Sequence, residues 1–514
     1  MNNNDGRIDK NGNYNHTHNL ESITKTDKDN NNKNEKLFFS VWRNKYLQNE
    51  IQRHHRLYRK NKQLTIDKSM DQLRYHPHRR YTTSLNIAVN EPLEPQIIPY
   101  GAKKIHFTGN FNKPIKAGDI PNTVNNLYFC NNFTQPIDIK STIPSSVTKL
   151  EITTYDSIVT PNMFPSSLTS LKIRSYQGSG IDIFPKSLNS LGIYDFNSEI
   201  VPGLFGSVEE LFLNSFNQPL EPKNLPKTCQ KLSLCKYIHP LKPKTLPPNL
   251  KRLNLSCFNH PISHGVLPET ITELLLGDFN QPLSNSLSSL KSLKRLSLFS
   301  FNQDLKNGEL PNSIEFLFLC SYNKTLKPNV LPSSITDLKF MHFNCQFEPQ
   351  AIPPNVKILW LNSYKLTLGK HLLPNNLETL TLNSKKTLLE NDLPSSITHL
   401  NCNFKGPNSF EINSIPPSVK TLRLTTENLQ PLPIGLIPNS VVKLTLNDYN
   451  HPLPVGVLPE SLTKLTFGDE FDQPLDSNAI PQSVTKISLY NKSYQHSIPE
   501  SLSKKLKIKK KTFF

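Results

Sequence analysis

Residues 216–220 have the sequence FNQPL, and residues 225–234 have the sequence LPKTCQKLSL. Pro226, which follows the first apolar residue of the second stretch, marks a unit that recurs along the chain after residue 95. Proline holds this marker position everywhere except at Phe205 and Leu290; the twenty markers are residues 99, 121, 144, 165, 185, 205, 226, 247, 268, 290, 311, 332, 353, 374, 394, 416, 438, 459, 481 and 499. Almost all are 20 to 23 residues apart, with a final step of 18. A period this short and steady predicts a solenoid.

The apolar residues of each unit keep fixed distances from the marker. After Pro165 they are Leu168, Leu171, Ile173 and Tyr176, which fits L-x-x-L-x-L-x-x-(F/Y). This spacing is typical of leucine-rich repeats, with an aromatic residue in place of the usual Asn. Since the L-x-L part has period two, we predict a short strand with Leu171 and Ile173 facing inward. The fold class is therefore a repeat solenoid with one short parallel β-strand per coil of about 21 residues.

A second motif, Phe-Asn followed by Gln, His or Lys and then Pro-Leu or Pro-Ile, recurs in the turns. It occurs at residues 111–115, 216–220, 258–262 and 279–283. The motif resembles the FNIP repeat, a leucine-rich repeat variant of amoebal proteins, and the resemblance covers roughly residues 95–500. Residues 364–366, 384–386 and 404–406 depart from it. We expect local irregularity there rather than a break in the solenoid.

A single coil cannot be stable by itself. About six apolar residues per coil contribute roughly 9 to 18 kcal/mol if fully buried, whereas ordering about 21 residues costs roughly 30 kcal/mol. Stacking must supply the remaining contacts. We expect the Phe or Tyr of each coil to lie over that of the next coil as an aromatic spine. We expect the following Asn to satisfy backbone groups at the turn.

Composition divides the chain into four parts. Residues 1–36 are rich in Asn and predicted to be disordered. Residues 37–90 are predicted as a helical N-terminal segment and linker, residues 91–503 as the solenoid of about twenty coils, and residues 504–514 as a basic tail. The chain shows neither an apolar signal segment after Met1 nor a run of about 18 apolar residues. We therefore expect a cytoplasmic location, with the nucleus as the alternative.

Residues 37–64 have helical spacing of apolar residues, including Phe39, Trp42, Tyr46 and Ile51. No Gly or Pro interrupts the segment. One interpretation is a helical cap over the open end of the first coil. The other is a docking helix for another protein, which would suit a substrate-recognition adaptor of a ubiquitin ligase.

Positive charge is concentrated at the two ends. Residues 1–90 carry 17 basic and 9 acidic side chains, a net charge of +8, and six lysines of the tail add +6. Of the total net charge of +18, residues 91–503 therefore carry only +4. The tail lysines are Lys504, Lys505, Lys507, Lys509, Lys510 and Lys511. They suggest a solvated tail, or a weak contact with anionic membrane or nucleic acid. Specific nucleic-acid recognition is not expected, because no basic stripe with interleaved aromatic residues follows the repeats.

The residue types needed for chemistry do not form a recognisable pattern. Seven cysteines without a C-x-x-C pair argue against a disulfide framework and fit a reducing compartment. The sequence lacks the phosphate-binding, zinc-protease, serine-hydrolase and kinase motifs. We therefore expect no enzyme activity, cofactor, metal or small-molecule substrate.

The outward face of the strands holds the best candidate site. Positions 7, 9 and 10 after the marker are predicted to point outward, and in four consecutive coils they hold large or charged residues: Phe299, Phe318, Lys339, Met341, His342 and Trp360. An exposed group of this kind is a candidate protein-binding hot spot. We therefore predict a monomeric, non-catalytic scaffold that binds an unidentified protein through its concave face. The alternatives are the ligase adaptor and a structural protein attached by its basic tail to membrane or nucleic acid.

Overall fold

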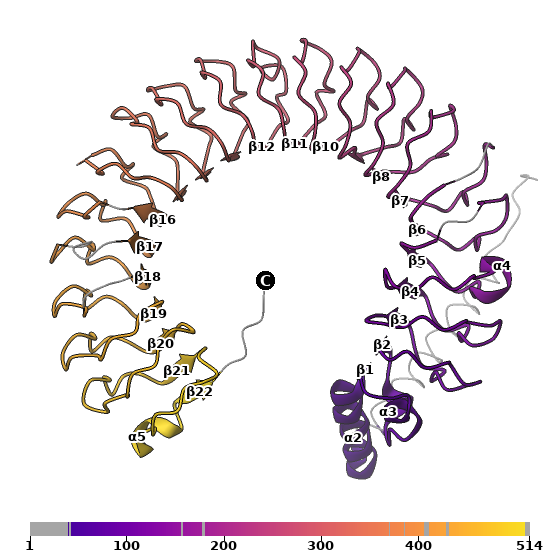
Figure 1. The fold of residues 1–514 in the computed structure, drawn as a ribbon, viewed down its shortest axis with the longest axis horizontal. Coiled ribbons are helices and arrows are strands. Elements are labelled where there is room, and N and C mark those ends of the chain that lie inside the picture. Colours follow the sequence, from indigo (N-terminus) through magenta and orange to yellow (C-terminus); the bar gives the residue numbers. More distant parts are fainter. Residues whose placement is uncertain are drawn as a thin grey trace, which may run out of the picture. The chain divides into compact units, whose positions relative to one another are not determined.

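The computed structural model describes residues 40, 43–155, 158–176, 180–369, 371–384, 386–405, 411–427 and 431–508. The chain divides into two compact units, residues 1–148 and 149–514. Both are built from the same coil, one short strand followed by a return segment (Figure 1). The predictions on residues 1–36 and 509–514 lie outside the described residues.

Unit 1 contains one long helix and four strands. The strands pair in parallel and in chain order. The elements are α2 (Lys45–Asn61), β1 (Gln63–Ile66), α3 (Asp71–Arg74), the 3-10 helix η1 (Arg79–Tyr81), β2 (Ser84–Ile87), β3 (Lys104–Phe107), β4 (Asn126–Phe129) and α4 (Ile139–Thr142).

Unit 2 contains eighteen described strands and one short helix, and each strand pairs in parallel with the next. The strands are β5 (Lys149–Ile152), β6 (Ser170–Ile173), β7 (Ser190–Ile193), β8 (Glu210–Leu213), β9 (Lys231–Ser233), β10 (Arg252–Leu255), β11 (Glu273–Leu276), β12 (Arg295–Leu298), β13 (Phe316–Leu319), β14 (Asp337–Phe340), β15 (Ile358–Leu361), β16 (Thr379–Ser384), β17 (His399–Lys405), β18 (Thr421–Glu427), β19 (Lys443–Asn447), β20 (Lys464–Phe467), β21 (Lys486–Leu489) and β22 (Leu506–Ile508); the helix is α5 (Glu500–Ser503). The predicted parallel solenoid is confirmed.

The core lies between each strand and its return segment. In the coil of β11, Ile271, Leu274, Leu276 and Phe279 occupy the predicted inward positions, and each is at most 1% exposed. Their counterparts in neighbouring coils are buried in the same way. The leucine-rich pattern therefore becomes a continuous apolar core, as the stacking argument requires.

The marker proline begins the turn that leads into each strand. The carbonyl of Pro374, for example, accepts a hydrogen bond from the Leu377 N–H at 3.2 Å. In many coils the residue three places before the marker has a positive φ, such as Asn329 at 61° and Gly308 at 83°. Asn and Gly enter this left-handed region at little cost. The turn is therefore fixed by a proline and a left-handed residue acting together.

The predicted aromatic spine runs through the middle of unit 2. Phe258 and Phe279 are nearly parallel, with ring centroids 6.4 Å apart and an interplanar angle of 2°. The same stack continues in both directions, through Phe196, Phe216, Tyr237, Phe258, Phe279, Phe301, Tyr322, Phe343 and Tyr364. Each ring therefore fills the space between the rings of the coils on either side.

The Asn that follows the aromatic residue forms a second ladder. The Oδ1 of Asn280 accepts a hydrogen bond from the Asn302 N–H at 2.8 Å, and the Oδ1 of Asn302 accepts one from the Asn323 N–H at 2.8 Å. This confirms the expected turn role and adds one detail. The backbone group that is satisfied belongs to the next coil, so the Asn holds two coils together.

The units that depart from the motif keep the sheet but change its strands. β16 has six residues, and β17 and β18 have seven, whereas β12 to β15 have four each. All of these strands stay paired with their neighbours. The expected irregularity without a break is found in β16 and β17, the coils of residues 384–386 and 404–406. The coil of residues 364–366 is regular, since β15 has four residues and Tyr364 stacks on Phe343. The long strand β18 was not expected.

The solenoid begins before the predicted boundary at residue 91. β1 and β2 lie within the segment predicted to be helix and linker. β1 pairs with β2, and β2 pairs with β3, in the usual parallel register. The turn after β2 holds Val89, Asn90, Glu91, Pro92 and Leu93, in which Val replaces the motif's Phe. The Oδ1 of Asn90 still accepts the hydrogen bond of the Asn112 N–H, at 3.0 Å.

The predicted N-terminal helix forms as α2, but it covers little of the first coil. Asn61 is the residue that it buries, and Tyr46 and Ile51 are 73% and 46% exposed. The first return segment instead buries Met70 and Leu73. The capping interpretation therefore does not describe the apolar side of α2. Phe39 and Trp42 lie outside the described residues.

The basic tail also begins inside the fold. Lys507 lies in β22, which pairs with β21, and Lys504 and Lys505 directly precede that strand. Lys509, Lys510 and Lys511 lie outside the described residues. The sheet therefore extends past the predicted end of the solenoid at residue 503.

Candidate functional site

The predicted strand-face residues lie on four neighbouring coils of unit 2. Phe318, Lys339 and Trp360 are direct register neighbours on β13, β14 and β15. Phe299 directly follows β12 and Met341 directly follows β14, so both lie at the ends of strands. Alternation along a strand places the three register neighbours on the face opposite the core.

The outward side chains of these coils contact one another through one ring–ring contact and several contacts between a cation and a ring. The rings of Phe299 and Phe318 meet edge to face, with centroids 5.1 Å apart. The Lys339 Nζ lies 4.1 Å from the centre of the Trp360 ring and 5.3 Å from that of Phe316. Cations over aromatic faces are attracted by about 0.5–1 kcal/mol at exposed sites. The interactions hold Lys339 and both rings in place before any partner arrives.

Arg295 on β12 adds a second cation beside the Phe316 ring. Its guanidinium carbon lies 3.9 Å from the centre of the Phe316 ring, and the two residues are register neighbours. We call the set Arg295, Phe299, Phe316, Phe318, Lys339, Met341 and Trp360 the aromatic patch. Its side chains are exposed or partly exposed. Such a rigid group of aromatic and cationic side chains is the composition found in protein-binding hot spots.

Three residues of this region were missed by the sequence reasoning: Arg295, Phe316 and Asp337. All occupy position 5 after their markers, which alternation places on the same face as position 7. The period of two along the strand was therefore sufficient to find them. His342 was predicted correctly as exposed, and it directly follows Met341 at the edge of the patch.

Asp337 supplies a carboxylate inside the aromatic patch. Its Oδ2 lies 3.6 Å from the Lys339 Nζ, and the exposed fractions of the two side chains are 23% and 21%. The other carboxylate oxygen, Oδ1, is buried without a hydrogen-bond partner among the described residues. Burial raises the pKa of Asp337, while the nearby Lys339 acts in the opposite direction. The Asp337 carboxylate is therefore enclosed by its neighbours, and its contact with Lys339 is made through Oδ2.

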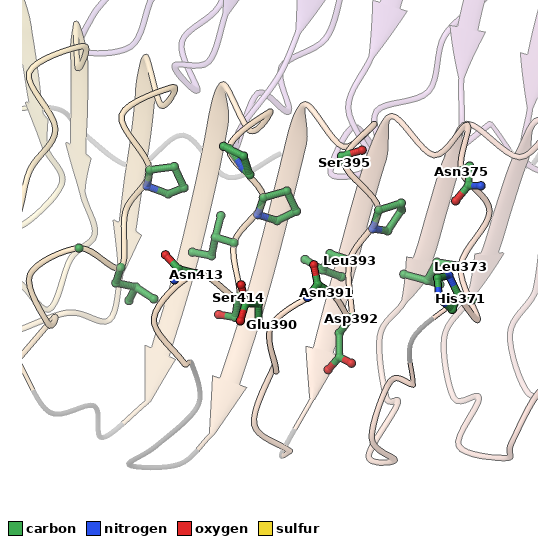
Figure 2. Close-up of a pocket in the computed structure, with 17 residues that line it drawn as sticks. His371, Leu373, Asn375, Glu390, Asn391, Asp392, Leu393, Ser395, Asn413 and Ser414 are labelled. Carbon is green, nitrogen blue, oxygen red and sulfur yellow. The ribbon is translucent and has the colours of Figure 1, made fainter.

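A cavity of about 520 Å³ lies elsewhere, on the return segments that precede β16 to β19 (Figure 2). Each coil lines it with the same few positions around its marker proline, including Asn391, Asp392 and Asn413. The Asp392 Oδ2 accepts a hydrogen bond from the Leu389 N–H at 2.9 Å, so this carboxylate stabilises its own turn. The cavity is thus a space between successive turns and brings together no catalytic pair.

The two remaining predicted groups are separate from the aromatic patch. Tyr46 and Ile51 are exposed on α2 in unit 1, and Lys504, Lys505 and Lys507 lie at the last strand of unit 2. Within the described part of the chain, no group of three His, Cys, Asp or Glu side chains could hold a metal ion. None of its helices is long and apolar enough to cross a membrane.

The model of the FNIP repeat matches the chain in eight stretches, some of which overlap, and together they include more than half of its residues. They are residues 90–131, 111–154, 133–176, 237–279, 322–364, 385–427, 407–448 and 449–492. No curated protein matches the chain.

Solved structures with a similar fold are leucine-rich-repeat proteins. CroV588, a circular protein of this class, is 22% identical with a TM-score of 0.54, over 87% of this chain and 79% of CroV588. A second is TLR13, solved in complex with ssRNA13; it is 14% identical with a TM-score of 0.55, over 84% of this chain and 78% of TLR13. At these identities the likeness establishes the fold.

Proposed function

Because the chain belongs to the FNIP repeat family and stacks its coils as a leucine-rich-repeat solenoid, we propose that it is a non-catalytic scaffold that binds a partner protein. The binding surface is the aromatic patch on the strand face of β12 to β15. One observation carries this proposal. Three of four consecutive coils present the rings of Phe299, Phe316, Phe318 and Trp360 outward, and the cations Arg295 and Lys339 lie between or beside these rings.

The energetics favour recognition of a protein surface. Trp and Arg are enriched among the residues that dominate binding energy, and large rings bury much area with little loss of conformational freedom. Lys339 is already positioned by Trp360 and Asp337, so less ordering cost accompanies association.

The test is capture of partners from a lysate of the source cells, with mass spectrometry to identify the proteins retained. The variant carries Phe318→Ala and Trp360→Ala. The matched control carries Ile434→Ala and Val455→Ala, since these exposed apolar residues lie outside the strands, in the segments before β19 and β20. We expect a set of proteins to be retained by the parent and the control and lost from the patch variant. Equal retention by all three folded proteins would remove the aromatic patch as the binding surface.

A second candidate function, the ligase adaptor, is favoured by one observation on α2. Tyr46, Leu47, Ile51 and Tyr58 are all exposed on this helix, so its apolar side is free to dock. Removing residues 37–64 would also remove the first residues of β1, of which Leu64 pairs with Leu85. The sharper test is therefore the triple variant with Tyr46, Ile51 and Tyr58 changed to Ala. Loss of cullin-ligase components from the captured set would support the adaptor, and their absence from the parent's set would contradict it.

A further inference from the structure

The last coils of unit 2 carry a row of lysines on the strand face. Lys443 on β19 is the register neighbour of Lys464 on β20, and Lys464 is the register neighbour of Lys486 on β21. All three side chains are exposed. Adjacent strands lie about 4.8 Å apart, so three positive charges follow one another at nearly the shortest spacing that a sheet allows. We call these three residues the lysine row.

The lysine row differs from the cations on the earlier coils of the same face. Lys172 pairs with Glu151 of the preceding coil, Lys231 with Glu210 and Arg252 with Glu273. Among the residues that the structure describes, no carboxylate forms an ion pair with Lys443, Lys464 or Lys486. Nearby acidic residues such as Asp448, Glu460 and Glu470 lie in turns outside the strands. Like charges directly opposite each other destabilise a sheet, so an anion lying over the row would relieve a repulsion that the fold leaves in place.

The positions beside the lysine row are small and polar. Thr445, Thr466 and Ser488 are register neighbours of one another, two residues after each lysine. At the same position β13 to β15 carry Phe318, Lys339 and Trp360, which project from the sheet. Thr445 and Thr466 are partly exposed, whereas Ser488 is buried. The lysine row therefore borders a low, hydroxyl-bearing surface on β19 and β20, and a rod-shaped partner can approach the sheet closely there.

We propose that the lysine row binds an acidic α-helix of a partner protein that lies across the strands. Carboxylates at i, i+3 or i+4, and i+7 of a helix repeat about every 5.4 Å along its axis, close to the strand spacing of about 4.8 Å. In an extended peptide, side chains on one face are about 6.7 Å apart, which differs more from the strand spacing than the helical repeat does. Its carboxylates would therefore match fewer lysines of the row. The hydroxyl groups of Thr445 and Thr466 supply neutral donors beside the lysines. This surface is separate from the aromatic patch and does not depend on it.

The direct test is fluorescence anisotropy on the full chain at low salt. The probe is a labelled Ala-rich helical peptide of about 20 residues with Glu at every third or fourth position, long enough to be helical. A second peptide has the same composition with the Glu residues scrambled around the helix. The test variant has Lys443, Lys464 and Lys486 changed to Gln. The matched control has Lys172, Lys231 and Arg252 changed to Gln, which removes the same charge from the same face at positions that already have carboxylate partners.

We expect the parent to bind the peptide with one acidic side more tightly than its scrambled form. The lysine-row variant should lose about tenfold in affinity, since it removes three exposed ion pairs with the peptide, each of which contributes modestly. The matched control should bind within about twofold of the parent, as should a variant with Arg in place of the three lysines. Trp360→Ala should leave this affinity unchanged, so failure of the aromatic patch and failure of the lysine row are distinguishable.

Three outcomes would overturn the proposal. The first is equal affinity of the parent and the lysine-row variant, and the second is an equal loss in the matched control. The third is binding of the parent to phosphatidylserine vesicles or to single-stranded oligonucleotide, but not to the peptide, with that binding lost in the lysine-row variant. The third result would assign the row to a phosphate-bearing surface instead.

Discussion

The coils of β8 to β15 and those of β16 to β18 solve the same structural problem in different ways. In the first group each strand is followed in the turn by a buried aromatic ring, such as Phe216 or Phe279. This ring stacks on the ring of the next coil. In the second group that ring is missing and the strand continues for two or three more residues. The register between β17 and β18 spans seven residue pairs, whereas that between β14 and β15 spans four.

The magnitudes explain why both solutions are stable. A fully buried Phe contributes about 1.5–3 kcal/mol, and its stacking adds about 0.5–1.5 kcal/mol. Two or three additional backbone hydrogen bonds contribute about 0.5–1.5 kcal/mol each. The longer ladder therefore offsets most of the missing ring. The comparison teaches that the repeat requires a stabilised strand end, and that either packing or hydrogen bonding can provide it.

The largest expected effect comes from removing a ring of the spine. Phe216 is fully buried between Phe196 and Tyr237, so Phe216→Ala should lower the free energy of unfolding by about 3–5 kcal/mol. Urea unfolding followed by circular dichroism measures the loss. The alkylation rates of two buried thiols show which coils are destabilised. Cys229 lies in the coil next to Phe216, and Cys402 lies in β17.

In a solenoid each coil contacts only its neighbours. Labelling of Cys229 should therefore accelerate much more than labelling of Cys402 in the Phe216→Ala variant. Equal acceleration of both thiols would show that the two groups of coils open as one unit, and the comparison between them would fail.

A smaller effect is expected from the Asn ladder of the coils with four-residue strands. Asn280→Ala removes the acceptor of the Asn302 N–H and of the Gln303 side-chain amide. The expected loss is about 1–2 kcal/mol in the free energy of unfolding, measured by urea denaturation. Asn280→Asp is the matched control, because it keeps the acceptor oxygen; Asp472 occupies the equivalent position before Gln473. If the Asp variant lost as much as the Ala variant, the ladder hydrogen bond would not be the cause.

The smallest effect concerns the outer face of the spine coils and depends on pH. Burial raises the pKa of Asp337 above its ordinary value of 3.8, so the folded state holds the proton more strongly than the unfolded state does. The contribution of Asp337 to the free energy of unfolding should therefore fall as the pH rises from 3.8 through the raised pKa of Asp337. Asp337→Asn removes this penalty, and its melting temperature should exceed that of the parent at pH 7 but not below pH 3.8. A difference that did not change with pH would contradict the assignment.

The sequence predicted the architecture closely because the repeat states the same physical solution many times. The marker prolines, the inward Leu positions and the aromatic spine followed from spacing. The departures from the motif located two of the three coils with long strands, β16 and β17, but not β18. The boundary at residue 91 was wrong because Val89 takes the place of the motif's Phe, although Asn90 keeps its ladder role. The sequence placed Phe318, Lys339 and Trp360 on the outward strand face, where they lie. It did not draw attention to Arg295, Phe316 and Asp337, and the binding role of this face stays a prediction.

What the sequence determined by itself was the coil: its length, its inward residues, and the turn that a proline and an Asn specify. These are local properties, because each depends on residues within one period of about 21. Only the tertiary structure decided which side chains of different coils meet. Three features depend on the register between strands that are one full coil apart in the chain. They are the position of Lys339 between Phe316 and Trp360, the buried oxygen of Asp337 and the neighbouring charges of the lysine row. Register is set by packing of the whole stack, so these surfaces emerge only when the coils are assembled.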